Sequence, residues 1–206
     1  MNDSHRLTTT EQVRAIIGEE VPVVRAKLFD ALDETAVAFI QHSPFLLLST
    51  ADANGKPDVS PKGDGPGFVA IEDERTLLVP ERKGNKLIFS LQNILANPRV
   101  ALLFLIPSTG ETLRVQGTAE LTADPKVLER LAARGAPALL AIRVRVETCF
   151  FHCAKAFKRS KLWDAPSWPE PLRVSFGRMM ARKLGGGAEL EGTIDQMIED
   201  DYKNNL

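Results

Sequence analysis

Apolar and polar positions along the chain indicate a helical start, a β-rich middle and a helical end. Within the first forty residues, apolar side chains recur at helical spacing in two segments, around residues 10–17 and over residues 24–40. Pro44 follows the second segment, and the residue before a proline is biased away from helical backbone. We therefore predict two amphipathic helices before residue 45.

Between residues 45 and 152, short apolar runs alternate with turn signals, which is typical of antiparallel strands. The first run, "FLLLST", is continuously apolar and predicts a strand buried on both faces, and the Asn54-Gly55 pair after it is a strong hairpin signal. Residues 113–121 alternate strictly, which predicts one buried and one wet face. The other predicted strands lie in "DVSP", "GFVAI", "TLLVP", "VALLFLIP" and "LLAIRVRVETCFF". Seven such strands favour a closed or nearly closed β-barrel.

Helical patterns also occur within and after the strands. One covers residues 84–95, and Asp124 followed by Pro125 begins another that reaches about residue 134. Two more flank the glycines at 185–187. We therefore expect a mainly β fold with flanking helices (α+β) in one domain. Its parts are an N-terminal helical segment packed on the barrel (1–44), a barrel core (45–168) and a C-terminal helical tail (169–206).

Composition narrows the class of protein. The 206 residues are 44% hydrophobic and 26% charged, which suits one globular domain with a substantial core. A formal net charge of −1 gives no reason to expect nucleic acid or an anionic membrane as a partner. No apolar run approaches the roughly 18 residues of a membrane span, and the first residues lack the apolar centre of a signal peptide. We therefore expect a cytoplasmic protein.

Basic and amide side chains gather where the helix over residues 84–95 is predicted to begin. Arg82, Lys83 and Asn85 lie there, and exposed N–H groups at a helix start together with a guanidinium suit a phosphate. The alternative is an ordinary solvated turn, although cations at that end oppose the helix dipole. A second cluster, Ser60 and Lys62 around Pro61, lies at a strand end, where an ordinary Gly/Pro loop is an equally good interpretation.

A third cluster lies in "FHCAKAFKRSKLWD", where Lys155 and Arg159 are four residues apart and share one face of a helix. The nearby Cys149, His152 and Cys153 have no companion pair at zinc-like spacing, so we expect no metal there. The chain contains no Walker loop, no dinucleotide fingerprint and no G-x-S-x-G motif. Side chains that can donate hydrogen bonds to an anion, without an evident catalytic acid, base or nucleophile, indicate chemistry carried by a phosphorylated cofactor.

Several motifs occur together in a recognisable order: "SPKGDGPGF", "PERKGN", "NILANP", "LRVQGTA" and "FHCAKAFKRSKLW". In this respect residues 45–168 resemble the pyridoxamine 5′-phosphate oxidase-like flavoproteins, and most of all a branch of FMN-dependent enzymes. The resemblance implies an FMN-binding split β-barrel that forms a homodimer, with FMN at the subunit interface.

The same resemblance implies roles for individual residues. A positive charge near the pyrimidine side of the flavin would favour its anionic reduced form, and Lys62 is implied for that place. The implied FMN contacts are Arg82, Lys83 and Asn85 on the phosphate, Ser60, Pro61 and Lys62 along the isoalloxazine edge, and Lys155, Arg159, Ser160 and Trp163 from the partner chain or over the ring.

The resemblance implies an FMN-dependent oxidoreductase that acts on an unidentified small molecule. The pyridoxamine oxidase itself ends in R-L-x-P, whereas this sequence ends "DDYKNNL", which argues against pyridoxamine 5′-phosphate as the substrate. The alternative is a non-catalytic protein on the same fold that binds or senses flavin, the deazaflavin F420 or haem.

Overall fold

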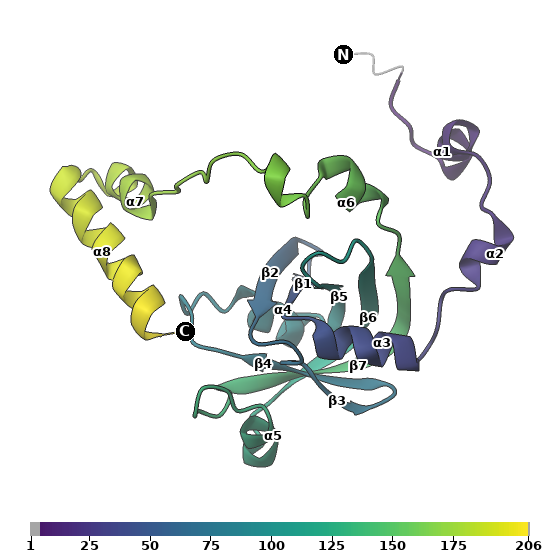
Figure 1. The fold of residues 1–206 in the computed structure, drawn as a ribbon, viewed down its shortest axis with the longest axis horizontal. Coiled ribbons are helices and arrows are strands. Elements are labelled where there is room, and N and C mark those ends of the chain that lie inside the picture. The colour runs from purple at the N-terminus through teal and green to yellow at the C-terminus, as the bar shows by residue number, and fades with distance from the viewer. Residues whose placement is uncertain (1–4, 206) are drawn as a thin grey trace.

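A seven-stranded antiparallel sheet with flanking helices makes up the centre of the molecule (Figure 1). The computed structural model describes residues 5–205. Along the sheet the strand order is β2-β1-β5-β6-β7-β4-β3. The strands are β1 (Phe45–Ala51), β2 (Pro57–Gly63), β3 (Ala70–Asp73), β4 (Thr76–Glu81), β5 (Arg99–Leu105), β6 (Thr112–Thr122) and β7 (Leu140–His152). The fold class predicted from the sequence, a mainly β split barrel with helices around it, is confirmed.

Local turn chemistry explains why the first two strands form a hairpin. Gly55 has φ of 80°, a conformation that glycine adopts without steric cost. The carboxylate of Asp52 accepts hydrogen bonds from the backbone N–H groups of Asn54 (2.8 Å) and Lys56 (2.9 Å). β1 and β2 then pair antiparallel from Phe45 opposite Gly63 to Ala51 opposite Pro57. The hairpin predicted from Asn54-Gly55 is therefore confirmed.

The core lies between the inner face of the sheet and two helices, α3 (Glu34–His42) and α4 (Phe89–Ala96). The predicted alternation over β6 is confirmed, with Leu113 and Val115 fully buried and Gln116 and Glu120 exposed. The prediction that β1 is buried on both faces is wrong: Leu46, Leu48 and Thr50 are buried, whereas Phe45 and the positions between are partly exposed.

The helix predicted over residues 24–40 is two separate helices, α2 (Pro22–Arg25) and α3. Between them, the backbone of Phe29 pairs with that of Cys149, with N–H to carbonyl distances of 3.0 and 2.8 Å. The Asp33 side chain then accepts from the N–H of Ala36 at 2.7 Å and caps the start of α3. The apolar spacing correctly predicted α3. The backbone pairing of Phe29 with Cys149 and the N-cap at Asp33 separate it from α2.

The helix predicted over residues 84–95 begins later, at Phe89. Two features keep the preceding residues out of a helix. The Asn85 side chain accepts from the N–H of Leu87 at 2.9 Å, and Lys86 has φ of 61°, in the left-handed region. Residues 82–88 therefore form a loop, and Arg82 and Lys83 do not lie on the first turn of α4.

The remaining helices lie outside the sheet: α1 (Thr10–Ile17), α5 (Pro125–Arg130), α6 (Lys155–Ser160), a 3₁₀ turn (Ala165–Ser167), α7 (Phe176–Leu184) and α8 (Ala188–Asn204). α7 and α8 form a hairpin around Gly185, separated from the sheet by an extended stretch (Figure 1). The two helical segments predicted around residues 185–187 are therefore confirmed. Residues 1–4 and 206 of the expected terminal segments lie outside the described residues. Within residues 5–205, no helix has the length and apolar character needed to cross a membrane.

Candidate functional site

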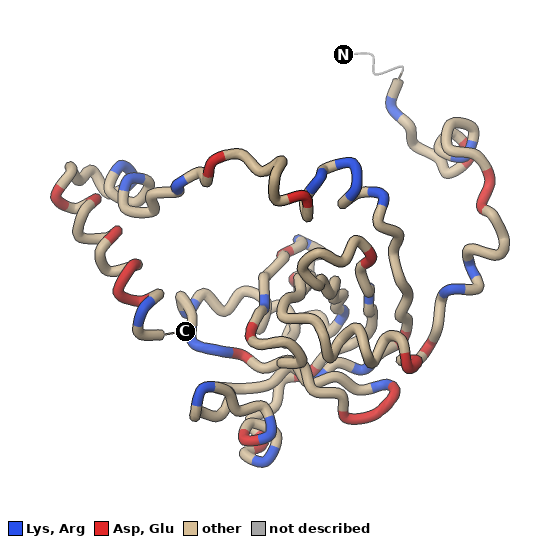
Figure 2. Tube along the Cα trace, in the orientation of Figure 1, with Lys and Arg blue, Asp and Glu red and all other residues tan. Residues whose placement is uncertain are grey.

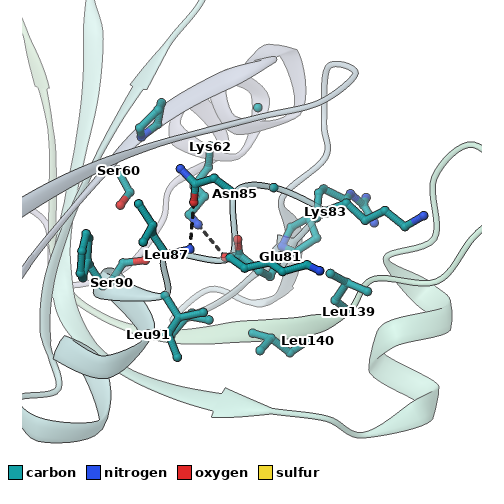
Figure 3. Close-up of a pocket in the computed structure, with 18 residues that line it drawn as sticks. Ser60, Lys62, Glu81, Lys83, Asn85, Leu87, Ser90, Leu91, Leu139 and Leu140 are labelled. Atoms are coloured by element: carbon teal, nitrogen blue, oxygen red, sulfur yellow. Dashed lines mark hydrogen bonds and ion pairs between the residues drawn. The ribbon is translucent and has the colours of Figure 1, made fainter. Parts of the chain in front are cut away.

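A cavity of about 540 Å³ lies where the C-terminal ends of β2 and β4 approach each other (Figure 3). β2 is one edge of the sheet and β4 lies near the other edge, so the cavity is at the seam of the split barrel. Its volume falls in the range of about 300–1,000 Å³ that is typical of cofactor sites. The lining comprises residues 60–63 of β2, residues 80–91 from the end of β4 through the loop to α4, and Leu139 and Leu140 at the start of β7.

Two of the three clusters predicted from the sequence meet in this cavity. Ser60, Pro61 and Lys62 contribute one wall, and Arg82, Lys83 and Asn85 contribute the loop on the other side. The first cluster lies on β2 and the second directly follows β4, about twenty residues later. Because β2 and β4 are not neighbours in the sheet, only the closure of the barrel brings the two clusters together.

Lys62 forms an ion pair with Glu81 across the seam (Figure 3). Lys62 Nζ lies 2.6 Å from Glu81 Oε2, and the two side chains are 13% and 22% exposed. The pair joins β2 to β4, which share no backbone hydrogen bonds in the sheet order. Glu81 was not among the residues selected from the sequence, although it lies in the quoted "PERKGN" motif. A glutamate beside basic residues forms no distinctive sequence pattern, so only the structure shows that Glu81 pairs with Lys62 across the seam.

A second set of ion pairs lies beside the first. Asp64, just after β2, accepts from Arg82 Nε at 2.8 Å and from Arg134 Nη1 at 2.6 Å. The backbone N–H of Gly65 donates to the same carboxylate at 2.9 Å. Burial of the Asp64 carboxyl tends to raise its pKa, but the Gly65 N–H and the two guanidinium groups outweigh that effect and lower the pKa below its ordinary value. Asp64 is therefore ionised at neutral pH and holds Arg82 at the cavity wall.

The other cavity groups differ in how firmly they are held. The Ser60 hydroxyl donates to Asp58 Oδ2 at 3.2 Å. Asn85 uses its side-chain oxygen in the loop turn, so its Nδ2 group is the part that can donate to a ligand. Lys83 is exposed on the loop. The cavity thus offers one guanidinium held by Asp64, one ammonium already paired with a carboxylate, and two exposed ammonium groups on the loop, those of Lys83 and Lys86.

Apolar side chains form the rim of the cavity. Leu87, Ile88, Phe89 and Leu139 line it and are between 50% and 62% exposed. Large apolar groups exposed together mark a ligand or protein contact more often than a bare surface. The sequence did not indicate Leu87, Ile88 and Phe89 as site residues, because they fitted the apolar face of the predicted helix. They are exposed because α4 begins only at Phe89.

The third predicted cluster does not line the cavity of the same chain. Lys155, Arg159 and Ser160 lie on α6, beyond the end of β7, where the tube in Figure 2 is strongly basic. Trp163 Nε1 donates to the carbonyl of Thr109 at 2.8 Å, and its ring stacks on Phe157 with centroids 5.6 Å apart. None of these four residues lines the cavity of its own chain.

The cysteine and histidine cluster is divided by the fold. Cys149 is buried in the core, where its thiol donates to the Ala31 carbonyl, whereas Cys153 is exposed. Burial raises the pKa of the Cys149 thiol, and Asp33 and Asp30 raise it further. Within the described part of the chain, no three His, Cys, Asp or Glu side chains are arranged to hold a metal ion.

A family model described as pyridoxamine 5′-phosphate oxidase matches residues 32–153, which is more than half of the sequence. The chain belongs to the pyridoxamine 5′-phosphate oxidase family. The matched region contains the whole sheet and the cavity, so the family assignment covers the part of the chain where the two clusters meet. A search of curated proteins gives no match.

Solved structures with similar folds include proteins with different ligands. A candidate pyridoxamine 5′-phosphate oxidase from Lactobacillus delbrueckii is 27% identical, covers 59% of this chain and 95% of its own, and has a TM-score of 0.46. An F420 reductase is 23% identical (57% and 98% coverage, TM-score 0.42). The haem storage protein HutZ from Vibrio cholerae is 15% identical (59% and 94% coverage, TM-score 0.40). All three TM-scores lie below 0.5, so the assignment rests on the family match alone.

Proposed function

We propose that the seam cavity binds FMN and that the protein is an FMN-dependent oxidoreductase acting on a small molecule. The observation that carries the proposal is that residues 60–62 of β2 and residues 82–85 of the loop after β4, from opposite sides of the seam, converge on one cavity of cofactor size in a chain of this family. FMN, when bound, supplies hydride transfer, which this set of side chains does not provide by itself.

The donor set fits the two chemical halves of FMN. The Arg82 guanidinium offers a planar fork to phosphate oxygens, and Lys83 and Asn85 add a charge and an amide donor on the same loop. The apolar rim formed by Leu87, Phe89 and Leu139 suits a flat hydrophobic ring. Lys62 in the opposite wall places a positive charge where the polar edge of such a ring would lie. Glu81 moderates that charge through the 2.6 Å ion pair.

We place the third cluster at the cavity of a second copy of the chain. Lys155 and Arg159 are exposed on α6 and add positive charge, and Trp163 and Phe157 form a stacked aromatic pair behind them. In a homodimer, these groups would approach the open rim from the partner and complete the FMN site. Light scattering should then give the mass of a dimer, and Arg159→Ala should weaken FMN binding although Arg159 does not line the cavity of its own chain.

The direct test is the absorption spectrum of the purified full chain, followed by titration of the ligand-free protein with FMN and riboflavin. We expect a flavin band, and FMN should bind more tightly than riboflavin because only FMN has the phosphate. A protein that neither carries nor binds flavin would contradict the proposal, and a Soret band or an F420 spectrum would favour haem or deazaflavin instead. Binding without turnover by any reduced donor would favour a sensing role.

Arg82→Ala identifies the phosphate end of the site. Loss of a charge-assisted contact costs about 1.5–3 kcal/mol, which raises the Kd of FMN by about 10-fold to 150-fold and leaves that of riboflavin nearly unchanged. Arg143→Ala is the matched control, because Arg143 pairs with Glu72 and Glu120 on the sheet and does not line the cavity. An unchanged FMN affinity in Arg82→Ala would show that the phosphate lies elsewhere.

A further inference from the structure

The Asp64 carboxylate contacts Arg82 from a place outside the proposed FMN cavity. Asp64 does not line that cavity; it lines a smaller one of about 260 Å³, and Arg82 lies between the two. The Asp64 side chain is only 6% exposed. Its oxygens accept from four donors on three residues: Arg82 Nε at 2.8 Å, Arg134 Nη1 at 2.6 Å and Nη2 at 3.4 Å, and the Gly65 N–H at 2.9 Å. The carboxylate is therefore a fixed point behind Arg82.

We propose that Asp64 is a positioning residue that orients the Arg82 guanidinium toward the phosphate of FMN, an inference that rests on the function proposed above. Arginine has a long, flexible side chain, and ordering it during ligand binding reduces affinity. Asp64 holds the Nε end before any ligand arrives. The two Nη groups are the other part of the fork, and they are the groups suited to two oxygens of one phosphate.

A nearby carboxylate also repels phosphate, and Arg134 explains how the chain offsets that effect. Two guanidinium groups share the single Asp64 carboxylate, so these three side chains keep a net positive charge. Arg134 comes from the segment between α5 and β7, and its backbone φ of 51° lies in the left-handed region. Asp64 is thereby anchored from a second side, and Arg82 keeps its attraction for an anion.

The test compares Asp64→Asn with the wild-type full chain by flavin fluorescence titration, using FMN and riboflavin as the two probes. Orientation of Arg82 affects only the phosphate, so the Kd of FMN should rise about tenfold while that of riboflavin stays within about twofold. Asp30→Asn is the control for loss of a carboxylate charge beside an arginine: it removes a 2.7 Å ion pair with Arg75, which precedes β4 at the end opposite Glu81, although Asp30 is 79% exposed. Both affinities should be unchanged in that control.

Each competing role gives a different result. If Asp64 acts only as a counter-charge, Asp64→Asn binds FMN more tightly; if it only supports the loop, FMN and riboflavin weaken in parallel. Either result overturns the proposal.

A double variant tests the same idea. Addition of Asp64→Asn to Arg82→Ala should weaken FMN binding no further, and independent losses of affinity would also overturn the proposal. Should Asp64→Asn fail to fold, Asp64→Glu replaces it, and wild-type FMN affinity in that variant counts against positioning. If the wild type binds neither probe, the proposed function itself fails.

Discussion

The Lys62–Glu81 ion pair gives the sharpest test of how the seam is held together. Lys62 Nζ and Glu81 Oε2 are 2.6 Å apart, and the side chains are 13% and 22% exposed. Glu81→Gln keeps the shape of the side chain and removes its charge. The perturbation therefore leaves the Lys62 ammonium in a mostly buried place without its carboxylate.

The size of the effect follows from this intermediate burial. Removing one partner of a fully buried pair costs about 3–5 kcal/mol, whereas a surface pair contributes about 0.2–1 kcal/mol. Between these limits, we expect Glu81→Gln to lower the free energy of unfolding by about 1.5–2.5 kcal/mol. Lys62→Met keeps most of the apolar stem and removes the charge, so the double variant should be about 1 kcal/mol more stable than the sum of the single changes predicts.

Urea unfolding of the ligand-free protein, followed by far-ultraviolet circular dichroism, measures all three variants. Glu120→Gln is the control, because its carboxylate is 67% exposed and lies 3.3 Å from Arg143 on the sheet surface. That control should change stability by less than about 0.5 kcal/mol. A Glu81→Gln variant that matches the control, or strict additivity in the double variant, would refute the view that this pair stabilises the seam.

Three further predictions concern the sheet and Asp64. In Gly117→Ala, the new β-carbon would lie 1.8 Å from the Arg145 carbonyl oxygen, so we expect a loss above about 3 kcal/mol in urea unfolding; wild-type stability would contradict the strand register. Leu102→Ala should cost about 2–5 kcal/mol because Leu102 is fully buried, and a loss below 1 kcal/mol would contradict its place in the core. The lowered pKa of Asp64 contributes stability that is present above the ordinary carboxyl pKa and is lost as pH falls through the folded value. The stability difference between wild type and Asp64→Asn should therefore shrink below about pH 4, and a constant difference would exclude this linkage.

Much of the fold could be predicted because its signals are local. Alternating apolar positions over β6, the Asn54-Gly55 turn and the Asp124-Pro125 helix start each depend on a few neighbouring residues. The two failures that concern helices, a continuous helix over residues 24–40 and a helix start at residue 84, share one cause. Apolar spacing continued through both places, but a backbone pairing with Cys149 in one and a side-chain turn at Asn85 in the other ended the helix.

The candidate site was predictable only in part. Residue types suited to an anion identified Ser60, Lys62 and Arg82, because phosphate needs donors and positive charge wherever they lie in the chain. Asp64 and Glu81, which hold two of those groups in ion pairs, are acidic, and the sequence around an acidic residue does not indicate which cation it will pair with. The apolar rim was hidden within a helical pattern.

By itself, the sequence determined the strands, most of the turns and the set of basic and polar side chains suited to an anion, because each follows from the chemistry of adjacent residues. The tertiary structure decided which of those side chains line one cavity. Closure of the sheet sets β2 against β4, and with them Lys62 against Glu81 and Asp64 against Arg82, although neither pair is close in sequence. It also separates α6 from the cavity of its own chain, so Lys155 and Arg159 do not line it. Such distances depend on the path of the whole chain, which no local pattern encodes.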